Sequence, residues 1–383
     1  MKIAIFGLSL SSSWGNGHAT TWRALVKALA ARGHKIVFFE REAGWYRAHR
    51  DLPDPEHCKL VLYEGTARLE AFSDEIGRQD AVIVGSYVPD GIEIAEWVLD
   101  RANGVVAYYD IDTPVTLEAL DRGDCPYLST DLVRRFDVHF SFSGGRALEI
   151  LKVEHGARRP VALHCGVDTS LYRPVAPPRR WALGYLGTYS ADRQAAVEAL
   201  LIEPARARPD LEFVVAGPQY PDDIEWPQNV MRIEHVPPAA HPAFYCQLGL
   251  ALNVTRRQMV ELGHSPSVRL FEAAACGAAI VSDAWPGLSE VFEPDREILV
   301  VEDTRDVLAI LDLPEPVRAA IGRAARERAL SSHSARARAE TLLAAIAEAR
   351  ADRFGDNRER TADSGRKSDV REVSAEPANA GCH

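Results

Sequence analysis

The stretch "KIAIFGLSLSSSWGNGHATTWRALVKALAARGHKIVFFE", residues 2–40, predicts a strand, a loop, a helix and a second strand in succession. Its ends, "KIAIFG" and "KIVFFE", are short apolar runs, which are typical of parallel strands covered on both faces. Between them, apolar residues recur at the spacing of one helical face: Trp22, Leu25, Val26 and Leu29. Gly33 then ends the helical pattern. This succession predicts an α/β fold built on a parallel sheet.

The alternation of strands and helices continues to about residue 172. Further apolar runs predict strands at 59–64, 81–86, 104–110 and 137–143, and helical segments lie at 92–101 and 145–154. The proline-rich stretch "RPVAPPRR", residues 173–180, predicts a linker. The pattern then restarts, with a helix at 191–205 and strands at 181–187, 211–217, 230–236, 248–254, 278–283 and 297–303.

We therefore predict two doubly wound, Rossmann-like domains that face a cleft, one over residues 1–172 and the other over residues 181–332. An amphipathic segment at 333–351 predicts one more helix. Residues 352–383 are polar and low in aliphatic residues, which predicts a disordered tail. Ligands of open α/β sheets bind beyond the carboxyl ends of the strands, so we expect the functional site in the cleft.

Composition and charge exclude several classes of function. The net charge of −11 over 383 residues disfavours generic nucleic-acid binding, although a local basic pocket for a small anion remains compatible with it. The six cysteines are scattered without paired spacing, which argues against a disulfide framework and a zinc site. We find no apolar run of membrane-spanning length and no leader pattern, and therefore expect a cytoplasmic protein.

The segment "SPSVRLFEAAACGAAIVSD", residues 265–283, predicts a helix followed by a strand. We expect Ser265 to be the N-cap, Pro266 the first helical residue and Gly277 the end of the helix. The free N–H groups of such a first turn form an anion site. A diphosphate is the anion we expect, bound at Ser265, Ser267 and Val268.

Two charged residues further along this helix extend the hypothesis. Arg269 adds a charge-assisted bond to the diphosphate. Glu272, about two turns past the predicted cap, is placed to accept the hydroxyl protons of a ribose. The alternative interpretation is a plain helix start with Glu272 on a solvated face.

The longer segment "SPSVRLFEAAACGAAIVSDAWPGLSEVF" resembles the donor-site motif of GT-B glycosyltransferases. It is most similar to glycosyltransferase family 4 and to the CgeB-like group with its "glycosyl transferases group 1" domain. The resemblance implies that Glu272 binds the nucleotide ribose and that the family's sugar-binding acid falls on His264. Similar motifs are "SSWGNGHATTWRALVKALAARGHKIVFFER", "LHCGVDTSLYRP" and "LGYLGTYSADR". The resemblance also implies that the final helix crosses back to the first domain.

The loop "GLSLSSSWGNGHAT", residues 7–20, does not have the spacing of the GxGxxG dinucleotide fingerprint. In GT-B enzymes this loop faces the cleft, so the resemblance places Gly15, Asn16 and Gly17 near the acceptor. His18 opens the following helix, where the dipole disfavours the imidazolium. A packing histidine is the alternative. A second turn, at Ser143 and Gly144, is predicted to border the cleft or to be purely structural.

Asp110 and Asp112 form a D-x-D pattern after an apolar strand. Metal-dependent transferases of the GT-A type hold a cation and a nucleotide diphosphate with such a pattern. A structural alternative is a helix start with Thr113 as cap and Pro114 in the first turn. The resemblance favours a third interpretation, in which either aspartate lies where retaining GT-B enzymes carry a catalytic histidine.

The loops after two strands of the second domain complete the predicted donor site. Gly187 and Thr188 leave room for a diphosphate, and Arg193 can neutralise it. Arg256 or Arg257 is the candidate second cation. Gly217 and Pro218 are expected to border the base, and Glu290 to lie on a loop that closes over the donor.

The resemblance implies a metal-independent, retaining glycosyltransferase without a cofactor. It would move a sugar from a nucleotide-diphosphate sugar to a glycan, lipid or protein acceptor, with peripheral membrane association as a further possibility. Three other functions remain open. They are a nucleotide-sugar epimerase on the same fold, a metal-dependent transferase that uses Asp110 and Asp112, and a non-catalytic nucleotide-sugar-binding protein.

Overall fold

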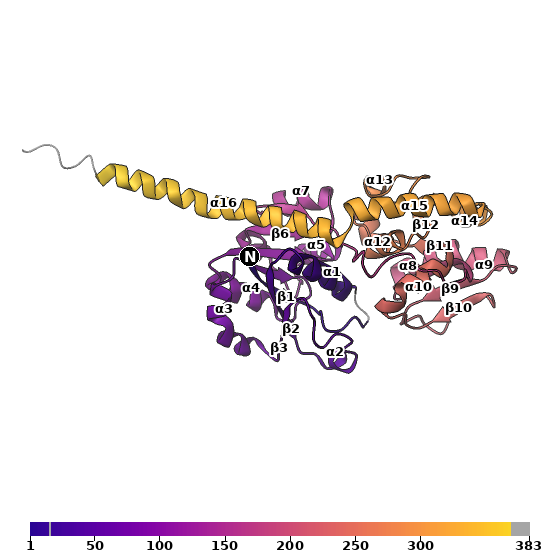
Figure 1. Ribbon diagram of the computed structural model, residues 1–383, viewed down its shortest axis with the longest axis horizontal. Coiled ribbons are helices and arrows are strands. Elements are labelled where there is room, and N and C mark those ends of the chain that lie inside the picture. Colours follow the sequence, from indigo (N-terminus) through magenta and orange to yellow (C-terminus); the bar gives the residue numbers. More distant parts are fainter. Residues whose placement is uncertain (15–16, 369–383) are drawn as a thin grey trace, which may run out of the picture.

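The computed structural model describes residues 1–14 and 17–368 and contains two parallel sheets (Figure 1). The first sheet has the order β3-β2-β1-β4-β5-β6-β7. Its strands are β1 (Lys2–Gly7), β2 (Lys35–Arg41), β3 (Lys59–Tyr63), β4 (Ala81–Gly85), β5 (Val105–Asp110), β6 (Val138–Ser141) and β7 (Pro160–Ala162). The short edge strand β7 was not predicted from the sequence.

The second sheet repeats the same arrangement in the order β10-β9-β8-β11-β12-β13. Its strands are β8 (Trp181–Leu186), β9 (Phe213–Ala216), β10 (Val230–Ile233), β11 (Leu248–Asn253), β12 (Ile280–Asp283) and β13 (Leu299–Val301). In both sheets the chain starts centrally, builds two strands to one side and then returns to build the other side, as in doubly wound folds. The predicted α/β fold of two Rossmann-like domains is confirmed.

Helices cover both faces of each sheet (Figure 1). In the first domain they are α1 (His18–Ala30), α2 (Gly44–Ala48), η1 (Thr66–Phe72), α3 (Ser73–Gly77), α4 (Gly91–Arg101), α5 (Thr113–Arg122), α6 (Thr130–Arg135) and α7 (Arg146–Val153). The second domain contains α8 (Ala191–Val197), the π-helix η2 (Glu198–Ile202), α9 (Glu203–Ala207), η3 (Pro238–Ala240), α10 (His241–Gln247), α11 (Arg257–Leu262), α12 (Val268–Ala275), α13 (Leu288–Val291) and α14 (Thr304–Leu311).

Alternating residues of the central strand β1 explain why the sheet is covered on both sides. Ile3 and Ile5 point to the face that packs against Trp22 of α1, whereas Ala4 and Phe6 point to the face that packs against Ile94 of α4. The four strand residues are fully buried. Burial on both faces is the reason that these strands appear in the sequence as continuous apolar runs.

Two long helices end the described chain. α15 (Glu315–Ser332) packs on the second domain, and α16 (Ala335–Ser368) crosses to the first, where its Leu342 and Ile346 join the core that contains α1 (Figure 1). None of the helices in residues 1–14 and 17–368 is long and apolar enough to span a membrane.

The last helix extends into the stretch 352–383, for which the sequence predicts a disordered tail. α16 continues to Ser368, well past the predicted end of this helix at 351. Contacts with the first domain hold the helix just beyond residue 351. There Arg353 donates to Asp137 at 2.8 Å and to the carbonyl of Gly104 at 2.8 Å. Such long-range partners are invisible in a polar sequence. Residues 369–383 lie outside the described chain.

Candidate active site

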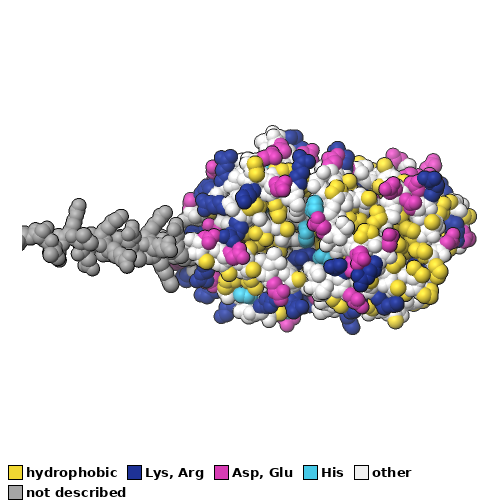
Figure 2. All heavy atoms as spheres, turned by 90° about the horizontal axis from the view of Figure 1, so that it is seen from above, with side chains coloured by type: hydrophobic (Ala, Val, Ile, Leu, Met, Phe, Trp, Pro, Cys, Tyr) yellow, Lys and Arg dark blue, Asp and Glu magenta, His cyan; other side chains and the backbone are white. Residues whose placement is uncertain are grey.

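The carboxyl ends of both sheets face each other, and two adjoining cavities lie between the domains. The first, of about 250 Å³, is lined by Ser13, Gly17, Thr20, Leu186, Gly187, Thr188, Arg193, Gly217, Pro218, His235, Val236, Pro238, His241, Tyr245, Ser267, Val268, Arg269 and Glu272. This lining contains the residues predicted for ribose and base, which are Glu272, Gly217 and Pro218. It also contains those predicted for the diphosphate, except Ser265 and the candidate second cations Arg256 and Arg257. Figure 2 shows histidine side chains along the seam between the two halves of the molecule.

The second cavity, of about 270 Å³, adjoins the first between the domains. It is lined by Gly17, His18, Thr21, Ile111, Asp112, Phe142, Cys165, Arg193, Val254, Thr255, Arg256, Met259, Ser267 and Val268. Four residues border both cavities: Gly17, Arg193, Ser267 and Val268. A ligand that occupies both cavities must therefore pass the start of α12 and the side chain of Arg193.

The predicted start of α12 needs a correction. Its N-cap is Ser267, whose hydroxyl accepts from the N–H of Arg269, so neither Ser265 nor Pro266 belongs to the helix. Ser265 is fully buried, and its hydroxyl donates to the carbonyl of Gly263 at 2.7 Å. Gly263 and His264 both have positive φ, of 74° and 48°, and this turn delays the helix by two residues. The end at Gly277, with φ of 75°, is confirmed.

Glu272 lies five residues past the corrected N-cap, which is about one and a half turns. Its side chain is buried and lines the first cavity, so the alternative of a solvated face is wrong. Tyr245 donates its phenolic hydrogen to Oε2 of Glu272 at 3.2 Å, and Nδ1 of His241 lies 3.7 Å from the same oxygen. Burial and the neighbouring carboxylate raise the pKa of Tyr245, which keeps its hydroxyl a donor. Glu272 is thus held in place, with its carboxylate at the cavity.

Arg269 lines the first cavity, and three contacts hold its guanidinium group in place. Its Nη1 donates to Oδ1 of Asn253 at 3.0 Å, its Nε donates to the carbonyl of Leu186, and its guanidinium stacks over Tyr185 at 4.7 Å. Gly187 follows Leu186 in the sequence and lies beside the Arg269 guanidinium group. A Cβ at Gly187 would lie 2.6 Å from Nη2 of Arg269. This close approach explains the need for glycine at this position.

Gly217 packs against Gly187 in the same way. Its φ of 141° is a conformation that favours glycine, and a Cβ there would clash with the carbonyl oxygen of Gly187. The two glycine-containing loops, which follow β8 and β9, are therefore packed directly against each other.

Arg193 and Arg256 are the cations with unused hydrogen-bonding capacity at the second cavity. Arg193 donates from Nη2 to the carbonyl of Thr188 at 2.7 Å, but its buried Nε has no hydrogen-bond partner among the described residues. The buried Nε of Arg256 also lacks one and lies 4.0 Å from Oδ2 of Asp192. Arg257 instead pairs with Glu261 at 3.2 Å and lines neither cavity. Of the two candidates for the second cation, the structure brings Arg256 to the site.

His18 and Asp112 face each other in the second cavity. The Nε2 atom of His18, the first residue of α1, lies 3.7 Å from Oδ2 of Asp112, which is the N-cap of α5. Asp112 thus takes the cap position that the sequence suggested for Thr113.

Asp110 lies below this cavity and lines neither of the two. Its carboxyl group is fully buried, where it accepts from the Thr116 hydroxyl at 2.9 Å and from the Asp112 N–H at 3.2 Å. Burial raises the pKa of Asp110 to about 7. Asp110 is thus placed to support the Asp112 loop and not to touch a ligand in either cavity.

Three other predicted residues lie at the contact between the domains, outside both cavities. The Oγ atoms of Ser143 and Ser265 are 2.6 Å apart, and the N–H of Gly144 donates to the carbonyl of His264 at 2.9 Å. The imidazole of His264 turns to Glu290, at 3.2 Å. Ser143 and Gly144, predicted to border the cleft or to be structural, thus lie against the second domain and line neither cavity. Gly15 and Asn16 lie outside the described residues.

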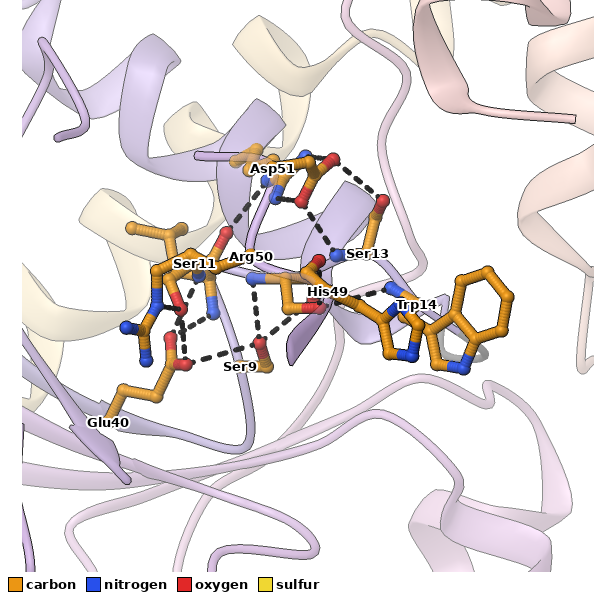
Figure 3. A network of polar contacts seen from close by, with 11 residues as sticks. Ser9, Ser11, Ser13, Trp14, Glu40, His49, Arg50 and Asp51 are labelled. Atoms are coloured by element: carbon orange, nitrogen blue, oxygen red, sulfur yellow. Dashed lines mark hydrogen bonds and ion pairs between the residues drawn. The ribbon is translucent and has the colours of Figure 1, made fainter. Parts of the chain in front are cut away.

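The serine-rich loop after β1 is ordered by two carboxylates (Figure 3). Glu40, at the end of β2, accepts from the N–H groups of Leu10 and Ser11 at 2.7 and 2.8 Å and from the Ser11 hydroxyl at 2.6 Å. Asp51 accepts from Ser13 through its N–H at 3.0 Å and its hydroxyl at 2.8 Å. The predictions missed these carboxylates, as well as His241 and Tyr245, because no local motif links them to the site.

The comparisons with known proteins agree with this architecture. Residues 193–344 match the protein-family model described as "Glycosyl transferase-like". No curated protein sequence matches the chain.

Solved structures match over most of the chain at low sequence identity. Sucrose-phosphate synthase from Thermosynechococcus elongatus is 15% identical, with a TM-score of 0.65 over 89% of this chain and 97% of that one. Anabaena HepE in complex with UDP and glucose is 12% identical, with a TM-score of 0.66 over 91% and 100%. An alpha-glucosyltransferase in complex with UDP and DNA is 13% identical, with a TM-score of 0.67 over 91% and 99%. The chain therefore has the GT-B fold of these structures, and its residues 193–344 match a family described as glycosyl transferase-like.

Proposed function

We propose that the chain transfers a sugar from a UDP-sugar to an acceptor hydroxyl in the interdomain cleft, without a metal ion and with retention of configuration. The observation that carries the proposal is the position of Glu272, which is buried and faces the same cavity as the first turn of α12. UDP is bound by the structurally similar HepE and alpha-glucosyltransferase. Retention is what the resemblance to glycosyltransferase family 4 implies.

The cavity linings suggest an order for the parts of the donor. Glu272 accepts the ribose hydroxyls, and the N–H groups at the start of α12, at Ser267 and Val268, bind the diphosphate with Arg193. The base then lies at the end of the first cavity that Gly217 and Pro218 border. The transferred sugar enters the second cavity, because the diphosphate lies at the wall that the two share.

The charges that develop during transfer have partners in this arrangement. The leaving diphosphate is stabilised by the positive end of α12 and by Arg193 and Arg256, which supply the role that a cation fills in metal-dependent transferases. His18 and Asp112 line the same cavity, where a polar pair can accept the acceptor proton or orient the acceptor hydroxyl.

The test is UDP release from UDP-glucose and other UDP-sugars, with a panel of glycan, lipid and protein acceptors and with or without EDTA. We expect acceptor-dependent release that survives chelation and that is reduced in Glu272→Ala at low UDP-sugar concentration. The anomeric configuration of the product, read by NMR, tests retention. Loss of activity in EDTA would instead support a metal-dependent enzyme, and acceptor-independent conversion to an epimeric UDP-sugar would support an epimerase. UDP-sugar binding without turnover for any acceptor would leave a binding protein and overturn the proposal.

A further inference from the structure

Trp14 of the first domain makes a ring contact with the second. Its indole stacks on His49 with the ring centroids 4.1 Å apart and the planes at 10° (Figure 3). On the other side it lies 5.0 Å from the ring of His235, which follows β10 in the second domain. His235 lines the first cavity, so the three rings reach from the surface of one domain to the wall of a cavity in the other.

The backbone around Trp14 is fixed by hydrogen bonds. The Ser12 hydroxyl donates to the carbonyl of His49 at 2.9 Å and accepts from the N–H of Trp14 at 3.4 Å, so that one side chain joins both members of the stacked pair (Figure 3). Asp51 accepts a hydrogen bond from Ser13, which lies between Ser12 and Trp14. The Arg23 guanidinium group donates two hydrogen bonds, of 2.7 and 3.0 Å, to the Asp51 carboxylate. The indole is therefore presented toward the second domain by a loop that is already ordered.

The position of the base follows from the donor order proposed above, on which this inference rests. With the ribose at Glu272 and the diphosphate at the start of α12, the base occupies the far end of the first cavity. Gly217 and Pro218 border this end after β9, and His235, Val236 and Pro238 line the same cavity after the neighbouring strand β10. His235 thus stands between the base end of the cavity and Trp14.

We infer that Trp14 is a nucleotide-positioning residue, which closes the base end of the donor cavity from the opposite domain by supporting His235. The ligand it serves is the planar heteroaromatic base of a nucleoside diphosphate. Trp14 is 36% exposed, so this large aromatic ring is partly open to solvent, and the adjacent Ser13 lines the cavity. Because the contact joins both domains, nucleotide binding and domain closure strengthen each other by reciprocal linkage.

The test compares the affinity for UDP of wild type, Trp14→Ala and Trp45→Ala by isothermal titration calorimetry. Trp45 is 63% exposed on the same domain and lines neither cavity, which makes it a matched control. We expect the Kd for UDP to rise about 2- to 10-fold in Trp14→Ala, which is the range that the loss of one aromatic pair gives when its interaction free energy is converted to affinity. We expect no change in Trp45→Ala, a near-normal Kd in Trp14→Phe, and a smaller rise in His49→Ala.

Tryptophan fluorescence supplies a readout that a merely structural role would not move. UDP should change the emission of wild type and of Trp45→Ala, and a large part of this change should be lost in Trp14→Ala. An unchanged Kd and an unchanged fluorescence response in Trp14→Ala would overturn the inference while UDP binding, and with it the proposed function, still stands. Failure of the wild-type protein to bind UDP would overturn both.

Discussion

The Nε2 atom of His18 lies 3.7 Å from Oδ2 of Asp112, at the point where the start of α1 meets the start of α5. The two residues are 94 positions apart in the sequence, at the starts of two helices, and both line the second cavity. His18 is buried, which limits the motion of its imidazole ring. The ring nitrogen Nε2 is the atom that faces the Asp112 carboxylate. This pairing leads to the first prediction.

His18→Ala and Asp112→Asn should each lower kcat while leaving the Kd for UDP within about twofold of wild type. Positioned acid–base groups contribute about 10²- to 10⁴-fold to a rate, and neither residue borders the nucleotide cavity. Steady-state kinetics with UDP-glucose and calorimetry with UDP separate the two effects.

Another histidine–aspartate pair of the first domain serves as the control. Nε2 of His155 lies 3.6 Å from Oδ1 of Asp121, outside both cavities. Asp121→Asn should therefore retain wild-type kcat. Equal losses in Asp112→Asn and Asp121→Asn would show that these pairs matter only for folding.

Glu272→Ala should weaken UDP binding by about tenfold or more, because a carboxylate that accepts ribose hydroxyls makes charge-assisted hydrogen bonds. Tyr245→Phe should weaken binding less, since it removes only the donor that orients the carboxylate at 3.2 Å. Calorimetry with UDP measures both. Glu293→Ala, on an exposed glutamate away from the cavities, is the control. Unaltered UDP affinity in Glu272→Ala would remove the ribose site.

Much of the fold could be predicted because buried parallel strands are continuous apolar runs, as the fully buried β4 shows. The donor helix was located for a similar reason, since its apolar face and Gly277 mark its course and end. Its start could not be predicted. Ser265 has the right chemistry for a cap, but the positive φ of His264 turns its hydroxyl to Gly263 and Ser143.

The parts of the site that depend on long-range contacts were beyond a single sequence. Tyr245 reaches Glu272 from a helix 27 positions earlier, and Glu40 orders the serine loop from 29 to 31 positions away. Neither pair has a fixed spacing, because the partners lie on separate elements: Tyr245 and Glu272 on α10 and α12, and Glu40 on β2 beside the loop that follows β1. Arg256 and Arg257 are adjacent in sequence, and only the direction of α11 decides which one faces the cavity.

Arg256→Met should reduce kcat/KM by about tenfold or more, because its Nε has no hydrogen-bond partner among the described residues and, in the proposed donor arrangement, lines the cavity where charge develops on the departing diphosphate. Its effect on UDP affinity should be smaller than that of Arg193→Met, since Arg193 borders both cavities and Arg256 only the second. Arg257→Met is the neighbouring control and should leave both quantities unchanged. The prediction fails where Arg257→Met is as damaging as Arg256→Met.

Asp110→Asn should stabilise the protein, and by more at pH 8 than at pH 5. The buried carboxyl group of Asp110 has its pKa raised from 3.8 to about 7, so the folded state holds one more proton than the unfolded state between these values. The free energy of unfolding of wild type therefore falls as the pH rises through this window, by about 4 kcal/mol in total. Asparagine resembles the protonated carboxyl group, keeps an acceptor for Thr116 and has no proton to lose.

Urea unfolding of wild type and Asp110→Asn at pH 5 and pH 8 measures the difference between their free energies of unfolding. We expect this difference to be larger at pH 8, above the raised pKa of Asp110. Asp121→Asn, on an aspartate with a 64% exposed side chain, controls for the loss of one negative charge. A stability gain of equal size at the two pH values would mean that Asp110 ionises in the folded protein as it does in the unfolded chain. The raised pKa of Asp110, and with it the loss of stability between pH 5 and pH 8, would then be ruled out.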